Sequence, residues 1–140
     1  MQYRIQENCK NIDWLAVYRV LQEAGMASHT LEETQKAFEN SYRVVFVFDK
    51  DLLMGVGRAI SDGSYEAGIF DVAVLPDYRG KKIGKLIMAE LHKGLPNINV
   101  ILYAKPEAQS FYKKIGYSKM LTGMAKFARE DRMREKGYTD

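Results

Sequence analysis

Three β-rich runs in the middle of the chain constrain the fold most. They are YRVVFVF at residues 42–48, LLMGVGRAI at 52–60 and YEAGIFDVAVL at 65–75, each rich in branched and aromatic side chains. The short connections Asp49-Lys50-Asp51 and Asp62-Gly63 separate them, and connections of this length join antiparallel neighbours. The sequence therefore predicts an antiparallel β meander.

Helical patterns come before the meander. Asn11 is the expected N-cap of a first helix. Thr30 followed three residues later by Glu33 is a capping-box pattern, so a second helix is expected over residues 31–40. A short strand is expected at residues 3–7, where apolar and polar side chains alternate.

The chain after the meander reads as helix, strand and helix. Apolar residues recur at three- and four-residue steps over 83–95, which predicts a helix with one buried stripe. NVILYA at 99–104 is then expected as a buried strand, and Pro106 opens a helix that Gly116 ends. A strand, a helix and a strand imply a parallel crossover. Residues 117–127 are expected to form a last strand or pair of strands.

Together these elements predict a mixed α+β fold, with a central, mostly antiparallel sheet of roughly six to seven strands and about four flanking helices. With 140 residues, 46% of them hydrophobic, the chain is expected to form one domain over residues 1–140. The stretch 127–140 is rich in charge, with eight charged residues out of fourteen, so it is expected to be a loosely ordered tail or a solvated helix.

The overall charge excludes little by itself. Lys and Arg total 21 against 18 Asp and Glu, and the net charge of +3 demands neither nucleic acid nor a membrane. Cys9 is the one cysteine, which excludes an internal disulfide or a cysteine-rich metal site and fits a reducing compartment. No apolar run has the length of a signal peptide or a membrane helix, so we expect a soluble, cytoplasmic protein without a metal cofactor.

A cluster of cations lies where the last run of the meander meets the following helix. The stretch VLPDYRGKKIGKLI places four cations and two glycines close together: Arg79, Gly80, Lys81, Lys82, Gly84 and Lys85. If the helix begins near Lys81, its unpaired N–H groups and its dipole favour an anion such as a phosphate there. The spacing is not that of a Walker loop, because three residues rather than four separate the two glycines. The alternative is a solvated basic surface.

A second stretch, AQSFYKKIGY at residues 108–117, has a helical apolar face made of Ala108, Phe111 and Ile115. Tyr112 lies about 100° around the helix from Phe111, so its ring can pack at the core edge while its hydroxyl reaches a cleft. Simple packing is the alternative role for this tyrosine.

These two stretches resemble the motifs of a known family. Residues 79–84 resemble the Q/R-x-x-G-x-G/A motif of the GNAT superfamily of N-acetyltransferases, and residues 108–117 resemble its A-x-x-F-Y-x-x-x-G-F/Y motif. The order and spacing of the motifs are similar to that family, as is the preceding meander. Lys82 stands where the first motif usually has glycine, and Lys105 stands where many members carry Asn.

The resemblance implies acetyl-CoA as the cosubstrate. Its pyrophosphate would lie on backbone N–H groups of the basic turn, and its pantetheine arm would pair like an added strand with residues 70–74, where the sheet splays before the next strand. A backbone N–H near Val74 would stabilise the thioester oxyanion. The implied cofactor-binding residues are Val72, Ala73, Val74, Arg79, Gly80, Lys81, Lys82, Ile83, Gly84, Lys85, Lys105 and Tyr112.

Acetylation of an amine needs a base and an acid. The attacking amine must be neutral, whereas an alkyl amine has a pKa near the ~10.4 of lysine. Asp71, the only charge in GIFDVAVL, is the first candidate to take the proton, and Glu66 is the second, directly or through a chain of waters. The alternative for Asp71 is a structural pair with Arg58 or a loop amide. By resemblance, Tyr112 returns a proton to the CoA thiolate as the general acid.

We therefore expect an acetyl-CoA-dependent N-acetyltransferase that transfers the acetyl group directly to a primary amine of a small molecule or a peptide, without an acyl-enzyme. The alternative is a non-catalytic regulatory module that binds an acyl-CoA or a polyanion through the same basic turn. For the enzyme, the expected partner is the amine substrate; nucleic acid and a membrane are not expected. The oligomeric state is left open, and the resemblance to a family whose members often pair makes a homodimer one alternative.

Overall fold

The computed structural model describes residues 3–26 and 29–140 of the chain. They fall into two compact units, Met1–Ile101 and Leu102–Asp140. None of the described helices is both long and apolar enough to cross a membrane.

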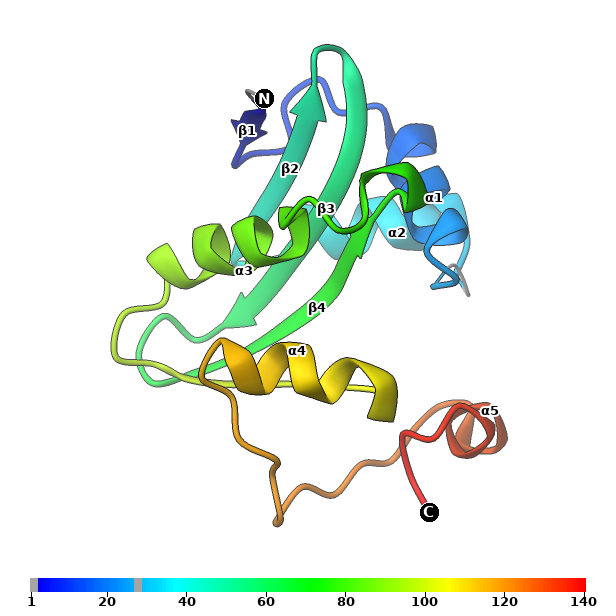
Figure 1. Ribbon diagram of the computed structural model, residues 1–140, viewed down its shortest axis with the longest axis vertical. Helices are drawn as coiled ribbons and strands as arrows, with labels where there is room; N and C mark the ends of the chain where they lie inside the picture. The colour runs from blue at the N-terminus through cyan, green and yellow to red at the C-terminus, as the bar shows by residue number, and fades with distance from the viewer. Residues whose placement is uncertain (1–2, 27–28) are drawn as a thin grey trace. The chain divides into compact units, whose positions relative to one another are not determined.

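One five-stranded sheet organises the first unit (Figure 1). Its strands are neighbours in chain order: β1 (Arg4–Gln6), β2 (Arg43–Asp49), β3 (Leu52–Ser61), β4 (Glu66–Val74) and β5 (Asn99–Leu102). The pairs β1–β2, β2–β3 and β3–β4 are antiparallel, which confirms the predicted meander and the short first strand. β5 joins the far side of β4, and near their starts the Asn99 N–H donates to the Tyr65 carbonyl at 2.9 Å.

Three α-helices belong to the first unit: α1 (Trp14–Glu23), α2 (Leu31–Glu39) and α3 (Ile83–Lys93). The predicted capping box begins α2, because Thr30 Oγ1 accepts from the Glu33 N–H at 3.1 Å and Glu33 Oε1 accepts from the Thr30 N–H at 2.9 Å. The N-cap of α1 is Asp13, whose side chain accepts from two N–H groups of the first turn. The prediction of Asn11 was wrong because Asn11 has a φ of 55°, a turn conformation rather than the extended one of an N-cap.

The helices cover opposite faces of the sheet (Figure 1). Gly57 of β3 faces α3, and its missing side chain lets the helix approach: a Cβ at Gly57 would lie 2.6 Å from Cγ2 of Ile87. On the other face, the rings of Trp14 from α1, Phe38 from α2 and Phe46 from β2 pack with centroids 5.7–6.2 Å apart. The β meander is therefore buried on both sides, as its long apolar runs require.

The second unit contains a short 3-10 helix, η2 (Pro106–Ala108), and two α-helices, α4 (Gln109–Lys114) and α5 (Glu130–Glu135). The helix predicted between Pro106 and Gly116 is thus a 3-10 turn that continues into α4. Gly116 follows the end of α4 with a φ of 101°, which glycine adopts without strain. For the charged end of the chain, a loosely ordered tail or a solvated helix was expected, and α5 corresponds to the helix.

The strand predicted at residues 117–127 is absent from the described second unit. Leu121 and Met124 in this segment are 90% and 97% exposed. Alternating polar and apolar residues form a stable strand only where a neighbouring strand pairs with the backbone and a core covers the apolar side. Over the described residues the sheet therefore has five strands rather than six to seven, and α5 brings the α-helices to five rather than about four.

The close approach of α3 to β3 makes Gly57→Ala a test of this packing. We expect the variant to lose about 1–3 kcal/mol of unfolding free energy, because the new methyl overlaps Ile87 and forces α3 away. Urea unfolding of the single variant, of Ile87→Ala and of the double variant measures the coupling. Gly57→Ala should cost less in the Ile87→Ala background, and equal costs in both backgrounds would contradict the contact.

Candidate functional site

The basic turn connects β4 to α3 through a one-turn 3-10 helix, η1 (Pro76–Tyr78). Gly80 has a φ of 79°, and a Cβ there would meet no atom within 4 Å, so the turn is open beside it. The N-cap of α3 is Lys82, with a φ of 63° in the left-handed region. The helix begins at Ile83, two residues after Lys81, and the side chains of the four cations are exposed.

The conformation of Lys82 explains a departure from the family motif. Lys82 occupies the position at which the motif usually has glycine, and it adopts the φ that glycine takes at no cost. A residue with a Cβ is destabilised there by ~1–2 kcal/mol. The main chain thus follows a glycine-like path at Lys82 despite the substitution.

This path leaves the first N–H groups of α3 available. The first i to i−4 bond at this end runs from the Leu86 N–H to the Lys82 carbonyl at 3.1 Å. The N–H groups of Ile83, Gly84 and Lys85 precede it and have no partner within the helix. Ile83 as a whole residue is 2% exposed, so its side chain belongs to the core and is not available to a ligand.

Tyr78 anchors the turn to the sheet. Its hydroxyl donates to Asp49 Oδ2 at 2.8 Å, and this bond raises the pKa of the Tyr78 phenol. The ammonium of Lys81 lies 5.5 Å from the centroid of the Tyr78 ring. The sequence pattern missed this anchor because Asp49 is 29 residues away, at the end of β2.

A β-bulge interrupts β4 just before the turn. Val56 pairs with Ala73 and Arg58 pairs with Phe70, so two residues of β4, Asp71 and Val72, lie opposite one residue of β3. Asp71 has a φ of 57°. A bulge cannot be recognised from an apolar run that contains one carboxylate, so the bulge at Asp71 and Val72 was not predicted from the sequence.

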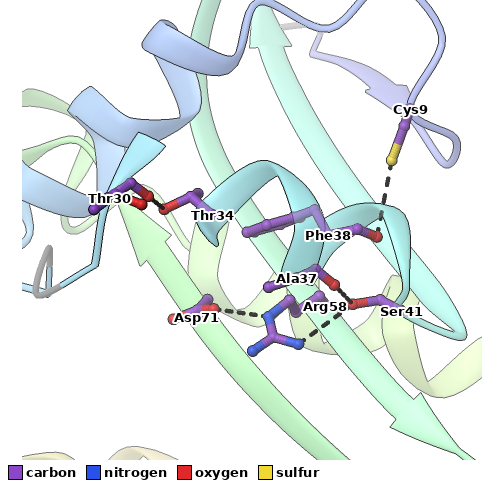
Figure 2. Close-up of polar contacts among 8 residues, drawn as sticks. All are labelled: Cys9, Thr30, Thr34, Ala37, Phe38, Ser41, Arg58 and Asp71. Carbon is purple, nitrogen blue, oxygen red and sulfur yellow. Dashed lines mark hydrogen bonds and ion pairs between the residues drawn. The ribbon is translucent and has the colours of Figure 1, made fainter. Parts of the chain in front are cut away.

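The bulge places Asp71 beside Arg58 on the face covered by α2 (Figure 2). Arg58 Nε donates to Asp71 Oδ2 at 2.7 Å, and Arg58 Nη1 lies 3.4 Å from Ser41 Oγ, which in turn donates to the Ala37 carbonyl at 2.7 Å. The guanidinium lies 5.8 Å from the ring centroid of Phe38. The ion pair that the sequence left open for Asp71 is therefore present, and a role for Asp71 as a base stays a prediction.

Glu66 lies away from this arrangement. It is exposed at the start of β4, and its Oε1 accepts from Asn99 Nδ2 at 3.2 Å. Five residues separate it from Asp71 along the strand, which corresponds to ~16 Å at ~3.3 Å per residue. The structure therefore does not bring the two candidate carboxylates together.

A hollow of about 320 Å³ lies near the same network, with Cys9, Phe38, Ser41 and Arg43 among its lining residues. Two of its charged side chains pair with each other, since Arg43 Nη2 donates to Glu7 Oε1 at 2.7 Å. Burial raises the pKa of the Cys9 thiol, and the nearby Glu39 carboxylate adds to this effect. Cys9 is thus held as a neutral thiol rather than as a nucleophile.

Tyr112 belongs to an aromatic cluster of the second unit. Its ring centroid lies 5.1 Å from that of Phe111 and 5.7 Å from that of Tyr117. Burial raises the pKa of the Tyr112 phenol, and an electrostatic contribution from Tyr138 adds to it. Lys105 lies at the start of η2 in the same unit and is half-buried.

Neither unit shows a metal centre. Among the described residues, no group of three or more His, Cys, Asp and Glu side chains is placed to hold a metal ion.

Comparisons with known proteins agree with the motifs and with this geometry. Residues 6–128 match the family described as Acetyltransferase (GNAT) domain. The chain is 31% identical to an uncharacterized N-acetyltransferase, ycf52, of Porphyra purpurea over 80% of this chain and 68% of that protein. It is 35% identical to ycf52 of Gracilaria tenuistipitata over 71% of this chain, but spans only 58% of that protein's length.

Solved structures give the same result. A crystal structure of a probable acetyltransferase from meticillin-resistant Staphylococcus aureus is 30% identical and superposes with a TM-score of 0.76 over 89% of this chain and 99% of that one. The two chains therefore share the same fold over most of their length. The chain belongs to the GNAT family of N-acetyltransferases.

Proposed function

We propose that this protein transfers an acetyl group from acetyl-CoA directly to a primary amine of a small molecule or a peptide, without an acyl-enzyme. The proposal rests on the backbone at Lys82, the N-cap of α3. Its φ of 63° is one that glycine adopts without strain, and it leaves the first N–H groups of α3 without partners inside the helix. Family membership supports the same chemistry.

The turn suits a pyrophosphate. The free N–H groups of Ile83, Gly84 and Lys85 and the positive end of the α3 dipole favour an anion, by ~0.3–1 kcal/mol from the dipole alone. The exposed cations Arg79, Lys81, Lys82 and Lys85 add positive charge around it. The open space beside Gly80 leaves room for the phosphates to reach the main chain.

The bulged end of β4 suits the rest of the cosubstrate. Acetyl-CoA supplies an activated thioester, and its pantetheine arm offers amides that can pair with main-chain groups of Val72 and Val74 like an added strand. A main-chain N–H in this stretch can donate to the developing oxyanion, an interaction worth ~2.7–4 kcal/mol per donor in other acyl-transfer enzymes. The bulge supports this role because it takes residues 71 and 72 out of regular pairing with β3.

Asp71 is the proposed proton acceptor. Its carboxylate is partly exposed, with 28% of the side chain accessible, and Arg58 holds it by a single bond to Oδ2. A carboxylate can accept on both oxygens, so this bond leaves acceptor capacity for an ammonium or for a relaying water. Glu66 stays the second candidate.

Tyr112 is the proposed acid. A proton has to reach the CoA thiolate as the amide forms, and the thiol has a pKa near the ~8.5 of free cysteine. Burial raises the pKa of Tyr112 above its ordinary value of ~10, so the phenol keeps its proton near neutral pH. The assignment follows the family motif, in which Tyr112 holds the position of the acid.

The variant Lys85→Glu tests whether the basic turn binds the phosphates of acetyl-CoA. This exposed residue is in the first turn of α3, where a carboxylate stabilises the helix but repels a phosphate. We expect unchanged or slightly higher thermal stability without ligand and about tenfold weaker acetyl-CoA binding, because attraction is replaced by repulsion. Lys10→Glu, which makes the same charge change at another exposed site, should bind as the wild type does.

Thermal shifts with acetyl-CoA, CoA and an oligonucleotide, followed by thiol release with an amine panel, complete this test. Stabilisation by CoA without thiol release from any alkyl amine, amino sugar or peptide N-terminus would favour the non-catalytic module. Wild-type protein with no affinity for acetyl-CoA at low salt would contradict the proposed enzyme.

Asp71→Asn separates the base from the ion pair. The amide keeps the shape and can still accept from Arg58, but it cannot take a proton. We expect kcat/KM for the amine to fall about a hundredfold near neutral pH, with little change in KM for acetyl-CoA. Because rising pH supplies neutral amine without a base, the loss should shrink at high pH. Glu66→Gln is the control, and a larger loss in that variant would transfer the role to Glu66.

Tyr112→Phe tests the acid. Turnover should fall by about a hundredfold while acetyl-CoA affinity changes less than about threefold, since the hydroxyl acts on the leaving group and the ring packing is kept. Steady-state thiol release and calorimetric titration measure the two effects. Tyr42→Phe removes a hydroxyl from a half-exposed tyrosine of the first unit and should leave both unchanged. Equal turnover in Tyr112→Phe and the wild type would remove the assignment.

A further inference from the structure

The ion pair between Arg58 and Asp71 is held firmly on one side. Arg58 Nε donates to Asp71 Oδ2 at 2.7 Å, and Arg58 Nη1 lies 3.4 Å from Ser41 Oγ. The guanidinium lies 5.3 Å from the ring centroid of Phe70 and 5.8 Å from that of Phe38, and only 15% of the Arg58 side chain is exposed. Hydrogen bonds and aromatic rings therefore fix the orientation of this arginine.

The other side of the same pair is open. Among the described residues, none forms a hydrogen bond with Arg58 Nη2 or with Asp71 Oδ1. Every fully buried side-chain nitrogen or oxygen in the described ranges has a hydrogen-bond partner, so these two atoms are accessible to solvent. Figure 2 shows both of them on the side of the pair away from Ser41. The pair thus offers an N–H donor of a cation beside an acceptor oxygen of an anion.

An open edge of this kind is complementary to a zwitterion. An α-amino acid carries an ammonium and a carboxylate on one carbon, so its ammonium can donate to Asp71 Oδ1 while its carboxylate accepts from Arg58 Nη2. A simple alkyl ammonium that approaches Asp71 also approaches the guanidinium, which repels it. A carboxylate beside the amine replaces this repulsion with attraction.

We propose that the acceptor is an α-amino acid, with its carboxylate bound by Arg58 and its amine presented to Asp71. The inference rests on the proposed function, in which Asp71 takes the proton of the amine, and it narrows the primary amine to one class. Arg58 is then a specificity-determining residue as well as the structural partner of Asp71. Both residues belong to the first unit, so the recognition is complete within it.

The transfer step conserves protons and bonds. The α-ammonium first gives one proton to the Asp71 carboxylate, and the neutral nitrogen then attacks the acetyl carbon. A C–N bond forms and the C–S bond breaks; the nitrogen loses a second proton, and the CoA thiolate takes one up. The products are an N-acetyl amino acid and CoA, and Asp71 returns to the carboxylate by releasing its proton to solvent.

The experiment extends the acceptor panel with matched sets. Free phenylalanine, leucine and alanine are each compared with the amine that lacks the carboxylate (phenethylamine, isopentylamine and ethylamine) and with the corresponding carboxamide. Thiol release at saturating acetyl-CoA gives kcat/KM for each acceptor, and the preference is the ratio of the amino acid to its amine. Comparing this ratio between protein variants cancels the intrinsic reactivity of the acceptors and any general loss of activity.

Three variants of the full chain are compared with the wild type. Arg58→Gln removes the charge but keeps an N–H that can donate to Asp71, and Arg58→Lys keeps the charge without the planar fork. Arg19→Gln, at an exposed position of α1, makes the same charge change as Arg58→Gln and is the control. Thermal melting of each variant reports whether it is folded.

We expect the wild type to prefer each amino acid over its amine by about tenfold, because a charge-assisted hydrogen bond is gained. The ratio should fall to about one in Arg58→Gln and by about threefold in Arg58→Lys, and it should be unchanged in Arg19→Gln. Calorimetric titration of the amino acids into protein with CoA needs no turnover. It should show about tenfold weaker binding to Arg58→Gln and no change for Arg19→Gln.

The failures are distinguishable. Thiol release with the amines but not with the amino acids overturns the acceptor class and leaves the proposed function intact. A preference that survives in both Arg58 variants overturns the role of Arg58, as does an equal loss for amino acids and amines, which a merely structural defect predicts. A carboxamide accepted as well as its acid overturns recognition of the carboxylate. Wild-type protein that releases no thiol with any acceptor, amino acids included, contradicts the proposed function itself.

Discussion

The packing of α3 against β3 at Gly57 is the contact on which the position of the basic turn, the candidate phosphate site, depends. The helix lies so close to the strand that Ile87 occupies the space of a Cβ. This contact fixes where the first turn of α3 lies, and with it the position of the main-chain N–H groups that can meet an anion. Buried glycines in a strand usually weaken it, so their presence here reflects the close approach that the helix requires.

Backbone strain marks both ends of the connection from β4 to α3. Asp71 and Lys82 have φ values of 57° and 63°, and the lysine in particular costs ~1–2 kcal/mol there, whereas Asp tolerates the region better. Two tertiary contacts hold this stretch: Arg58 pairs with Asp71, and Tyr78 donates to Asp49. Strain that surrounding contacts maintain is concentrated at functional sites, and here it lies where the motif places the cosubstrate.

Short sequence patterns predicted the elements that are stabilised by residues close together in the chain. Thr30 and Glu33 define α2 because a capping box is complete within four residues, and the tight turns of the meander fix its antiparallel order. The bulge at Asp71 depends on register with β3, which a single run does not encode. The segment 117–127 has the alternation of a strand but no strand partner in the described unit, and the ring contact between Tyr103 and Tyr138 joins residues 35 positions apart.

The two proposed proton-transfer groups owe their suitability to opposite surroundings. The Asp71 carboxylate accepts from a guanidinium that itself lies over aromatic rings, so an anion is held in place at the edge of the bulge. The Tyr112 phenol lies among rings and hydroxyls, where burial disfavours its anion and its pKa rises. Environments that hold one group as an acceptor and another as a donor allow base and acid to act at the same pH, which direct acetyl transfer between an amine and a thiolate requires.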